Sequence, residues 1–383
     1  MTPAAPETYP RIRFDRNELA GAFGDIGTDL PLIVGMILAS RLDAATVLIM
    51  FGAMQIFTGL FYGMPMPAQP LKAVAVIVIT QKLAPDVIYG GGLAIGVVML
   101  LLTITGLVAW LGRVIPKVVV RGIQFGLGLQ LATLALKDYL PKENANGYVL
   151  AAIAAVIAFA LYNNRRYPAA LFIIGLGFIY AFAFKKFDGL QNAVGLAWPK
   201  FHVPAWSDIL TGFLILALPQ VPLSIGNSVL GARRVAEDLF PTRAPSLTKI
   251  GLTYSFMNLV NPFFGGVPTC HGSGGLAGHY AFGARTGMSV IIYGSMYLIV
   301  GLFFSNGFEN VFHVFPLPIL GVILAFEATA LMLLVRDMTQ ERTTFFLVII
   351  TGLMACLLPY GYLVALISGT ILAYTLPKHP QFR

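Results

Sequence analysis

Two stretches of the sequence, GMPMPAQP at residues 63–70 and GGVPTCHGSGG at residues 265–275, interrupt long apolar runs and precede apolar segments that are too short to cross a bilayer. Proline has no backbone N–H, and glycine tolerates conformations that other residues avoid, so neither stretch is expected to be helical. Each predicts a half-length helix that begins inside the membrane, over about residues 71–83 and 270–283. Short segments interrupted by Pro and Gly at matching places in two halves of a chain are typical of transporter binding sites.

The composition around these stretches is that of an integral membrane protein. Of the 383 residues, 57% are hydrophobic and 11% are charged, whereas a soluble domain carries roughly 25% charge. Apolar runs of about 20 residues recur along the whole chain, which predicts an all-α membrane protein and excludes a porin-type barrel. The net charge of +8 is attributed to Lys and Arg retained in cytoplasmic loops, so no nucleic-acid partner is expected. Cys270 and Cys356 lie in predicted membrane segments, which excludes a disulfide-stabilised scaffold.

Apolar blocks bounded by Pro, Gly or charged residues predict about fourteen transmembrane segments. The first seven are expected near residues 18–40, 44–63, 71–83, 87–111, 116–136, 147–162 and 167–184. The second seven are expected near residues 208–231, 247–262, 270–283, 287–305, 311–335, 343–358 and 361–376. Segments three and ten are the two half-length helices. The loops that remain are too short for a separate soluble domain.

The two sets of seven segments match in the positions of their prolines. Pro65 and Pro268 are 203 residues apart, and Pro116 and Pro316, which begin segments five and twelve, are 200 apart. An odd number of segments in each half requires that the second half be inverted relative to the first, so a 7+7 inverted repeat is predicted. Placing the N-terminus in the cytoplasm puts 17 Lys and Arg inside and 7 outside, as the positive-inside rule favours. We therefore expect both termini in the cytoplasm and the chain in a bacterial inner membrane.

The polar residues around the two half-helices predict an anion site. A helix N-terminus presents free N–H groups and about half a positive charge, so two of them meeting near the midplane would bind an anion with little need for arginine. Lys72, in the first turn of the first half-helix, adds a full charge. Gln220, Ser224 and Asn227 on segment eight are spaced i, i+4 and i+7, which places them on one face of an α-helix. The remaining candidate donors flank the starts of the half-helices: Gln69, His271, Ser273 and the backbone amides of Gly272, Gly274 and Gly275. Interhelical hydrogen bonding and close helix packing are the structural alternatives for these residues.

Three intramembrane carboxylates also need an explanation, because a charge within a bilayer is expensive and marks function by default. Asp25 and Asp29 are spaced i, i+4 on segment one. The sequence leaves three interpretations of them open: ion pairing with Lys72, protonation as part of proton coupling, or capping of broken-helix backbone. Glu327 on segment twelve is either a proton-relay candidate or a partner in a tertiary hydrogen bond. No group of His and Cys has metal-ligand spacing, so neither a metal nor a cofactor is expected.

Four motifs resemble those of the molybdate transporter family, a branch of the sulfate-permease superfamily: GAFGDIGTDLPL, PMPAQPLKA, LPQVPLSIGNSVLGA and GGVPTCHGSGGLAGHYAFGARTG. The resemblance covers roughly residues 17–375. It implies the uracil-permease-like fold, with substrate held between the N-termini of segments three and ten. Carried onto this sequence, the family's site would use Thr28, Gln69 and the amides after it, Gln220, Asn227 and residues 271–275.

The resemblance also implies two domains that move against each other. A core domain would be formed by residues 18–111 and 207–305, and a gate domain by residues 112–206 and 306–376. Residues 1–17 and 377–383 would be cytoplasmic tails.

The sequence therefore predicts a secondary active transporter for a tetrahedral oxyanion, with molybdate favoured. Sulfate transport is the first alternative, since sulfate shares the charge and shape of molybdate, and tungstate is a further candidate substrate. A nucleobase permease on the same fold would want a carboxylate on segment eight, where Gln220 and Asn227 stand instead. No enzyme is expected, because neither a nucleophile–base set nor a metal set occurs, and the lack of an ATP-binding motif favours secondary transport. A channel or scaffold role stays open. Besides the oxyanion, the expected partners are membrane lipid and a second copy in a homodimer.

Overall fold

The computed structural model describes residues 10–161, 169–184, 194–304 and 315–376, which are helical over most of their length. The helices of the first half are α1 (Arg16–Gly21), α2 (Ile26–Ser40), α3 (Ala44–Tyr62), α4 (Lys72–Gln81), α5 (Pro85–Ile104), α6 (Leu107–Val114), α7 (Lys117–Leu134), α8 (Asn144–Ala160) and α9 (Ala169–Phe184). Those of the second half are α10 (Trp206–Gly212), α11 (Leu218–Leu223), α12 (Ala232–Leu239), α13 (Leu247–Val260), α14 (Ser273–Ala281), α15 (Met288–Phe303), α17 (Leu317–Leu333), α18 (Arg342–Leu357) and α19 (Gly361–Thr375). Several are extended by π or 3-10 segments: η1 (Ala135–Tyr139), η2 (Leu140–Glu143), η4 (Phe213–Ala217), η5 (Ser224–Gly231), η6 (Asn261–Phe264) and η8 (Leu334–Met338). The strands are β1 (Gln69–Pro70) and β2 (Thr269–Cys270).

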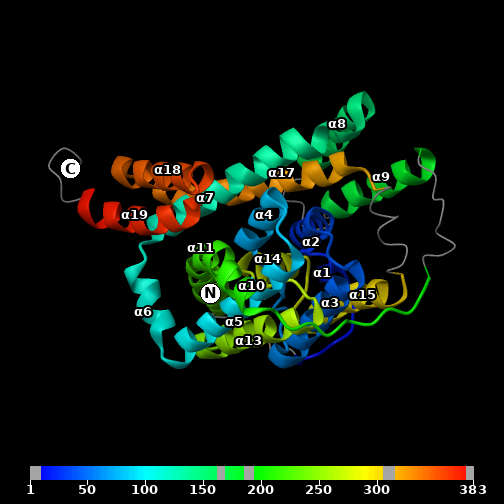
Figure 1. Ribbon diagram of the computed structural model, residues 1–383. Coiled ribbons are helices and arrows are strands. Elements are labelled where there is room, and N and C mark those ends of the chain that lie inside the picture. Colours follow the sequence, from blue (N-terminus) through cyan, green and yellow to red (C-terminus); the bar gives the residue numbers. More distant parts are fainter. Residues whose placement is uncertain (1–9, 162–168, 185–193, 305–314, 377–383) are drawn as a thin grey trace, which may run out of the picture.

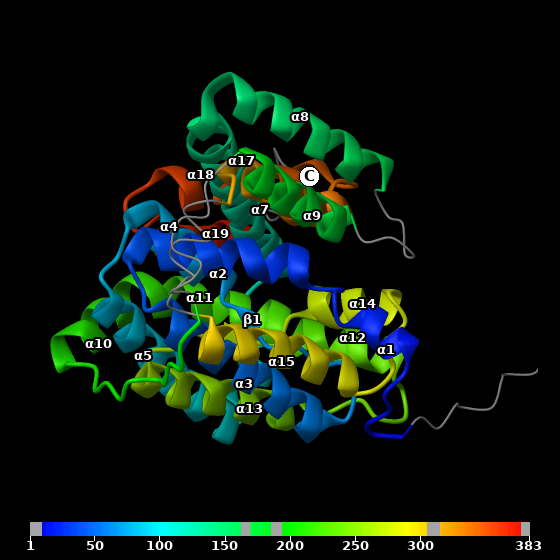
Figure 2. The same cartoon turned by 90° about the vertical axis from the view of Figure 1, so that its right-hand side faces the viewer.

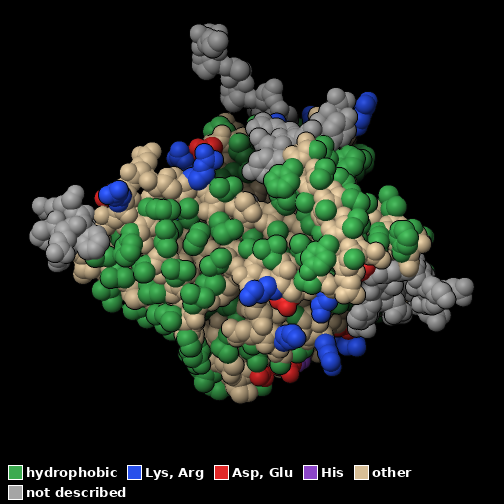
Figure 3. Space-filling model, turned by 90° about the horizontal axis from the view of Figure 1, so that it is seen from above, with side chains coloured by type: hydrophobic (Ala, Val, Ile, Leu, Met, Phe, Trp, Pro, Cys, Tyr) green, Lys and Arg blue, Asp and Glu red, His purple; other side chains and the backbone are tan. Residues whose placement is uncertain are grey.

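The helices form two layers. In both ribbon views, α7, α8, α9, α17, α18 and α19 lie together above the other helices (Figure 1, Figure 2). Within this upper layer α7 packs along α17 and α18, and within the lower layer α3 packs along α15 and α5 along α13. Contacts between the layers are made mainly by α2, α4 and α11. Seen from above, the side chains of the upper layer are largely hydrophobic, and the charged ones gather in a few small groups (Figure 3).

Five helical runs among the described residues are long and apolar enough to cross a bilayer: Ala44–Tyr62, Pro85–Ile104, Lys117–Ala160, Trp206–Leu239 and Leu317–Met338. Shorter apolar helices, α4 among them, accompany these runs. The helix content confirms the predicted all-α membrane class. The count of fourteen crossings and the inverted repeat stay predictions.

Two segments that were predicted as continuous helices are broken. Segment one is divided into α1 and α2, because the chain leaves the helical path at residues 22–25 and Asp25 takes the N-cap position of α2. The expectation that Asp25 shares a helix with Asp29 is therefore wrong. The break brings Gly24 so close to α14 that a β-carbon on Gly24 would lie 2.5 Å from the carbonyl carbon of Gly278. Segment four is divided into α5 and α6 at Gly106, whose φ of +74° favours glycine.

Segment eight belongs to a longer helical run, Trp206–Leu239, which contains two π-helical segments. The π-helical segments η4 and η5 lie on either side of α11, which contains Pro219 and Pro222. Proline has no N–H with which to complete an α-helical ladder, and wider π turns often accommodate such interruptions near functional sites. Because η5 begins at Ser224, the α-helical spacing that placed Asn227 on the same face does not hold beyond that residue.

Two short strands bring the half-length helices together. β1 and β2 pair antiparallel, with Gln69 opposite Cys270 and Pro70 opposite Thr269. β1 leads into α4 and β2 leads into α14. Since the strands are antiparallel and each helix begins just after its strand, α4 and α14 leave opposite ends of this two-residue ladder, and their N-termini lie on either side of it. The predicted half-length helices are thus present, and each follows its Pro- and Gly-containing stretch.

A buried amide side chain holds each of these stretches. Gln55 on α3 accepts a hydrogen bond from the Ala68 N–H at 3.0 Å and donates to the Ala68 carbonyl at 2.7 Å. Asn258 on α13 does the same for Thr269, at 3.0 and 2.6 Å. Both amides are fully buried and pair with the backbone as a neighbouring strand would. Non-helical backbone inside an apolar protein thereby keeps its polar groups satisfied.

Candidate functional site

The start of α4 is capped by a side chain from the second half of the chain. Gln220 Oε1 accepts hydrogen bonds from the backbone N–H groups of Ala73 and Val74, at 3.1 and 3.3 Å. Gln220 Nε2 donates to Ser224 Oγ at 3.0 Å, and Ser224 Oγ lies 2.6 Å from the Tyr254 hydroxyl. A helix N-terminus leaves several N–H groups without intrahelical partners. Gln220 satisfies two of them, and the chain through Ser224 to Tyr254 fixes its orientation.

Two side chains from the first half of the chain lie against the buried side of the start of α14. Gln69 Nε2 lies 2.6 and 2.5 Å from the two carboxylate oxygens of Asp25, and both side chains are buried. A β-carbon on Gly275 would lie 2.2 Å from Asp25 Oδ2, and one on Gly272 would lie 1.3 Å from Gln69 Oε1. Only glycine allows this approach. A carboxylate at a helix N-terminus is favoured by the helix dipole, so Asp25 lies where its negative charge is stabilised.

His271 holds the first stretch in place. Its Nδ1 lies 3.1 Å from the Pro67 carbonyl oxygen, and its Nε2 lies 2.7 Å from Thr253 Oγ1. A carbonyl oxygen can only accept, so Nδ1 is the donor and Nε2 accepts from the hydroxyl. The imidazole is fully buried, and both of its nitrogens are engaged within the fold.

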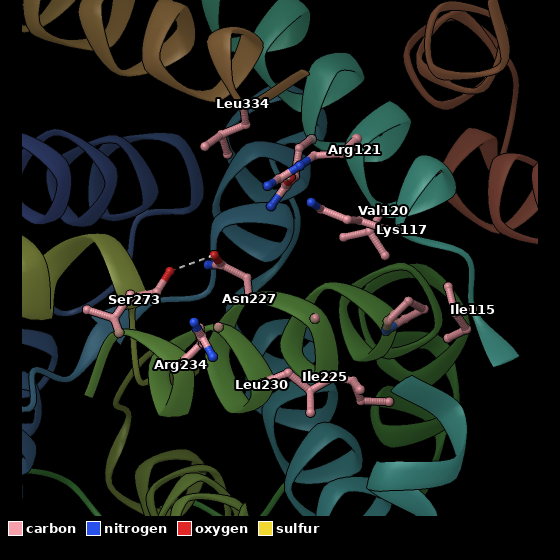
Figure 4. A pocket seen from close by; sticks show the side chains of 15 residues that line it. Ile115, Lys117, Val120, Arg121, Ile225, Asn227, Leu230, Arg234, Ser273 and Leu334 are labelled. Carbon is pink, nitrogen blue, oxygen red and sulfur yellow. Dashed lines mark hydrogen bonds between the residues drawn. The ribbon is translucent and has the colours of Figure 1, made fainter. Parts of the chain in front are cut away.

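Ser273 and Asn227 line a cavity between the two layers. Ser273 Oγ donates to Asn227 Oδ1 at 2.9 Å, and both residues are half-buried. The cavity measures about 520 Å³ and is walled by η5, α12 and α14 on one side and by α7 and η8 on the other. We call it the Arg121 cavity. Figure 4 shows Arg121 and Lys117 reaching into it from α7, opposite Asn227, Ser273 and Arg234.

Carboxylates accompany the cations of the Arg121 cavity. Asp337 lies 2.6 Å from Lys117 Nζ and 2.7 Å from Arg121 Nη2. Arg234 Nη2 lies 3.4 Å from Asp238. From the sequence, these cations are interpreted only as charges that set the orientation of the chain in the membrane. The signal that could have found them is the i, i+4 spacing of Lys117 and Arg121 directly after the proline that begins segment five.

The structure brings the predicted site residues together in pairs rather than in one cluster. Gln69 contacts Asp25, Gln220 contacts Ser224, and Asn227 contacts Ser273, as described above. The others take the following positions: Thr28 and Lys72 are half-buried in the first turns of α2 and α4, Asp29 is buried in α2, and Gly274 is exposed in the first turn of α14. Glu327 lies on α17, and its side chain is outside the described part of the chain. Among the described residues, no group of three His, Cys, Asp or Glu side chains is placed to hold a metal ion.

Comparison with known proteins identifies the family. Residues 17–131 and 212–331 match the family model "Molybdate transporter of MFS superfamily". The chain belongs to the molybdate transporter family. It is 35% identical to "Molybdate transporter 2" of Arabidopsis thaliana, with 87% of this chain and 82% of that protein covered.

Solved structures share the fold of this molybdate transporter family member. The transmembrane domain of the cyanobacterial bicarbonate transporter BicA matches with a TM-score of 0.66 at 15% identity, covering 95% of this chain and 98% of that one. The murine anion transporter Slc26a9, in an inward-facing state, matches with a TM-score of 0.70 at 12% identity, covering 96% and 69%. At these identities the likeness concerns the fold alone, and the fold agrees with the predicted uracil-permease-like architecture.

Proposed function

We propose that this protein transports molybdate as a secondary active transporter, by alternating access of a core domain against a gate domain. The observation that carries the proposal is the pairing of β1 with β2, which sets the N-termini of α4 and α14 on either side of one two-residue ladder in the fold of an anion transporter. Each helix N-terminus contributes about half a positive charge and free N–H groups. A tetrahedral dianion accepts hydrogen bonds on every side, so it suits such a site.

The oxyanion binds on the open side of α14 in this proposal. The first turn of α14 has a buried side, where Gly272 and Gly275 face Gln69 and Asp25. Its other side carries Ser273, which lines the Arg121 cavity, and Gly274, where an added β-carbon would meet nothing within 4 Å. The Ser273 hydroxyl and nearby amides donate to the oxyanion there, while the helix itself separates the ligand from the Asp25 carboxylate.

The arrangement of the helices in two layers supports the two proposed domains. The lower layer contains the helices of residues 18–111 and 207–305, and the upper layer those of 112–206 and 306–376 (Figure 1). The paired roles of Gln55 with Ala68 and of Asn258 with Thr269 support an inverted repeat, since equivalent groups stand 203 and 201 residues apart. With both termini in the cytoplasm, the Arg121 cavity opens to the cytoplasm.

Uptake into proteoliposomes tests this function. We expect labelled molybdate to accumulate, tungstate and sulfate to compete in that order of strength, and uracil to have no effect. Empty liposomes give the background. Competition by uracil with no accumulation of either oxyanion would replace the proposal with nucleobase transport. An imposed pH gradient in the same vesicles tests proton coupling through Asp29 or Glu327, which predicts faster uptake when the outside is acidic.

A further inference from the structure

A second cavity, of about 700 Å³, lies at the other end of α7. We call it the Lys137 cavity. Helix α7 lines the Arg121 cavity as far as Gln124 and the Lys137 cavity from Leu129 onward. Five residue steps of α-helix rise about 7.5 Å, so only this short part of α7 separates the two cavities along the helix. Like the Arg121 cavity, the Lys137 cavity has walls from the two layers. Helices α2 and α4 of the lower layer face α7, η1 and α18 across it.

Three lysines line the Lys137 cavity from three elements. Lys82 is the C-cap residue of α4, Lys137 belongs to η1 and Lys142 to η2. All three side chains are exposed. In the part of the chain that the structure describes, none of them forms a hydrogen bond or an ion pair. Asp138 is the single acid among the described wall residues.

Three neutral polar side chains of this cavity are already engaged with backbone. Thr80 Oγ1 donates to the Val76 carbonyl at 2.7 Å, and Thr133 Oγ1 donates to the Leu129 carbonyl at 2.8 Å. Gln130 Nε2 donates to the Cys356 carbonyl at 3.3 Å. The lysines are therefore the cationic groups of this wall that can bind an anion. An ammonium group is a point charge without the planar fork of arginine, so a site of this kind attracts dianions without selecting strongly among them.

We infer that the Lys137 cavity is a capture site for divalent tetrahedral oxyanions, where substrate collects before it reaches the start of α14. The inference rests on the proposed function. Cavities lined by one sign of charge raise the local concentration and the association rate of the opposite charge. The Arg121 cavity differs, because Asp337 and Asp238 accompany its cations. In the predicted orientation the three lysines face outside, so the cavity whose lysines have no ion-pair partner among the described residues admits the dianion, and the cavity whose cations are held in ion pairs releases it.

Replacing the three lysines together tests the capture site. We expect Lys82→Gln/Lys137→Gln/Lys142→Gln to raise the KM for molybdate uptake about threefold to tenfold and to leave the maximal rate within about twofold. Raising the salt concentration should slow wild-type uptake at low substrate, because the Debye length is about 10 Å at 0.1 M, and should affect the variant much less. The Arg triple variant at the same positions should restore the KM. Lys200→Gln is the matched control, since Lys200 is a lysine placed outside by the same orientation but lies next to Asp43, away from this cavity.

A second measurement needs no variant. Molybdate and sulfate should both protect Lys82, Lys137 and Lys142 of the wild-type protein from acetylation, quantified by peptide mass spectrometry, and should leave Lys200 unprotected. Unchanged KM and salt dependence in the triple variant, or absence of protection, would overturn the capture site while molybdate uptake itself stands. Failure of the wild-type protein to take up molybdate would instead overturn the proposed function.

Discussion

The starts of α4 and α14 repeat the same elements, but they differ in what covers them. Each helix follows a short strand, and the non-helical stretch that contains each strand is held by a buried amide from a neighbouring helix. The start of α4 is closed by the neutral Gln220 amide. The start of α14 has Asp25 on its buried side and the half-buried Ser273 beside a cavity on the other. Of these two similar helix N-termini, that of α4 is therefore capped, and that of α14 has a side open to a ligand.

This difference indicates which of the two helix N-termini binds the ligand and which one is held in place. A capped end is held in place and contributes its dipole from a distance, whereas an end with an open side can meet a ligand directly. The four changes below test that division, beginning with the one expected to disturb the molecule most.

Gly278→Ala should have the largest effect. A β-carbon there would lie 2.5 Å from the Gly24 backbone carbonyl oxygen, which cannot move aside without displacing α14 from the break between α1 and α2. Overpacking of this kind costs about 1–3 kcal/mol, and we expect a lower thermal midpoint in detergent together with loss of uptake. Gly274→Ala, on the same helix, meets open space and is the control for stability. Equal midpoints for the two variants would show that the close approach of Gly24 does not hold α14.

Removing the two backbone-binding amides should have the next largest effect on uptake, although the stability lost should be at least as great. Gln55→Leu leaves both polar groups of Ala68 without that partner, and Asn258→Leu does so for Thr269. Each buried group left unsatisfied costs about 1–3 kcal/mol. Thermal unfolding in detergent should show similar losses for the two variants if the halves are built alike. A large loss of stability for one variant and none for the other would show that the starts of α4 and α14 are not built alike.

The same residues show how much of the fold could be predicted from the sequence. Pro and Gly act on the backbone where they stand, so the half-helices after residues 63–70 and 265–275 could be predicted. The pairing of Gln69 with Cys270 could not, because it joins residues 201 apart. Gln55 and Asn258 gave no distinct signal either, since a single amide in an apolar helix has the same pattern as ordinary interhelical hydrogen bonding.

The way the candidate site residues are arranged could be predicted only in part, for similar reasons. Ser273 and Asn227 were expected to line the site, and they meet at the cavity. His271 was expected there as well, but its ring binds Pro67 and Thr253, contacts that depend on how distant segments pack. Lys117 and Arg121 went unrecognised because basic residues at the end of a span have the same pattern as orientation charges.

Exchanging the chemistry of the two caps should have an intermediate effect. Gln220→Glu gives α4 the kind of group that α14 has, and Asp25→Asn does the reverse. A carboxylate still accepts from the Ala73 and Val74 N–H groups and is favoured at a helix N-terminus, so Gln220→Glu should fold. It should nevertheless lose uptake, because the new charge repels a dianion. Gln220→Ala, which removes the cap, should lower stability by about 1 kcal/mol. Full uptake by Gln220→Glu would show that α4 lies too far from the ligand to matter.

Ser273→Ala should disturb the structure least and report on the ligand most directly. The change removes one hydroxyl that bonds Asn227 across a half-buried contact, so the loss of stability should stay near 1 kcal/mol. A hydrogen bond to a charged ligand is worth about 1.5–3 kcal/mol, so the KM for molybdate should rise about tenfold or more. Ser295→Ala is the matched control, because Ser295 donates to the Ile291 carbonyl within α15. If both serine variants keep the wild-type KM, the open side of α14 is not where the oxyanion binds, and the contrast between the two helix ends concerns stability alone.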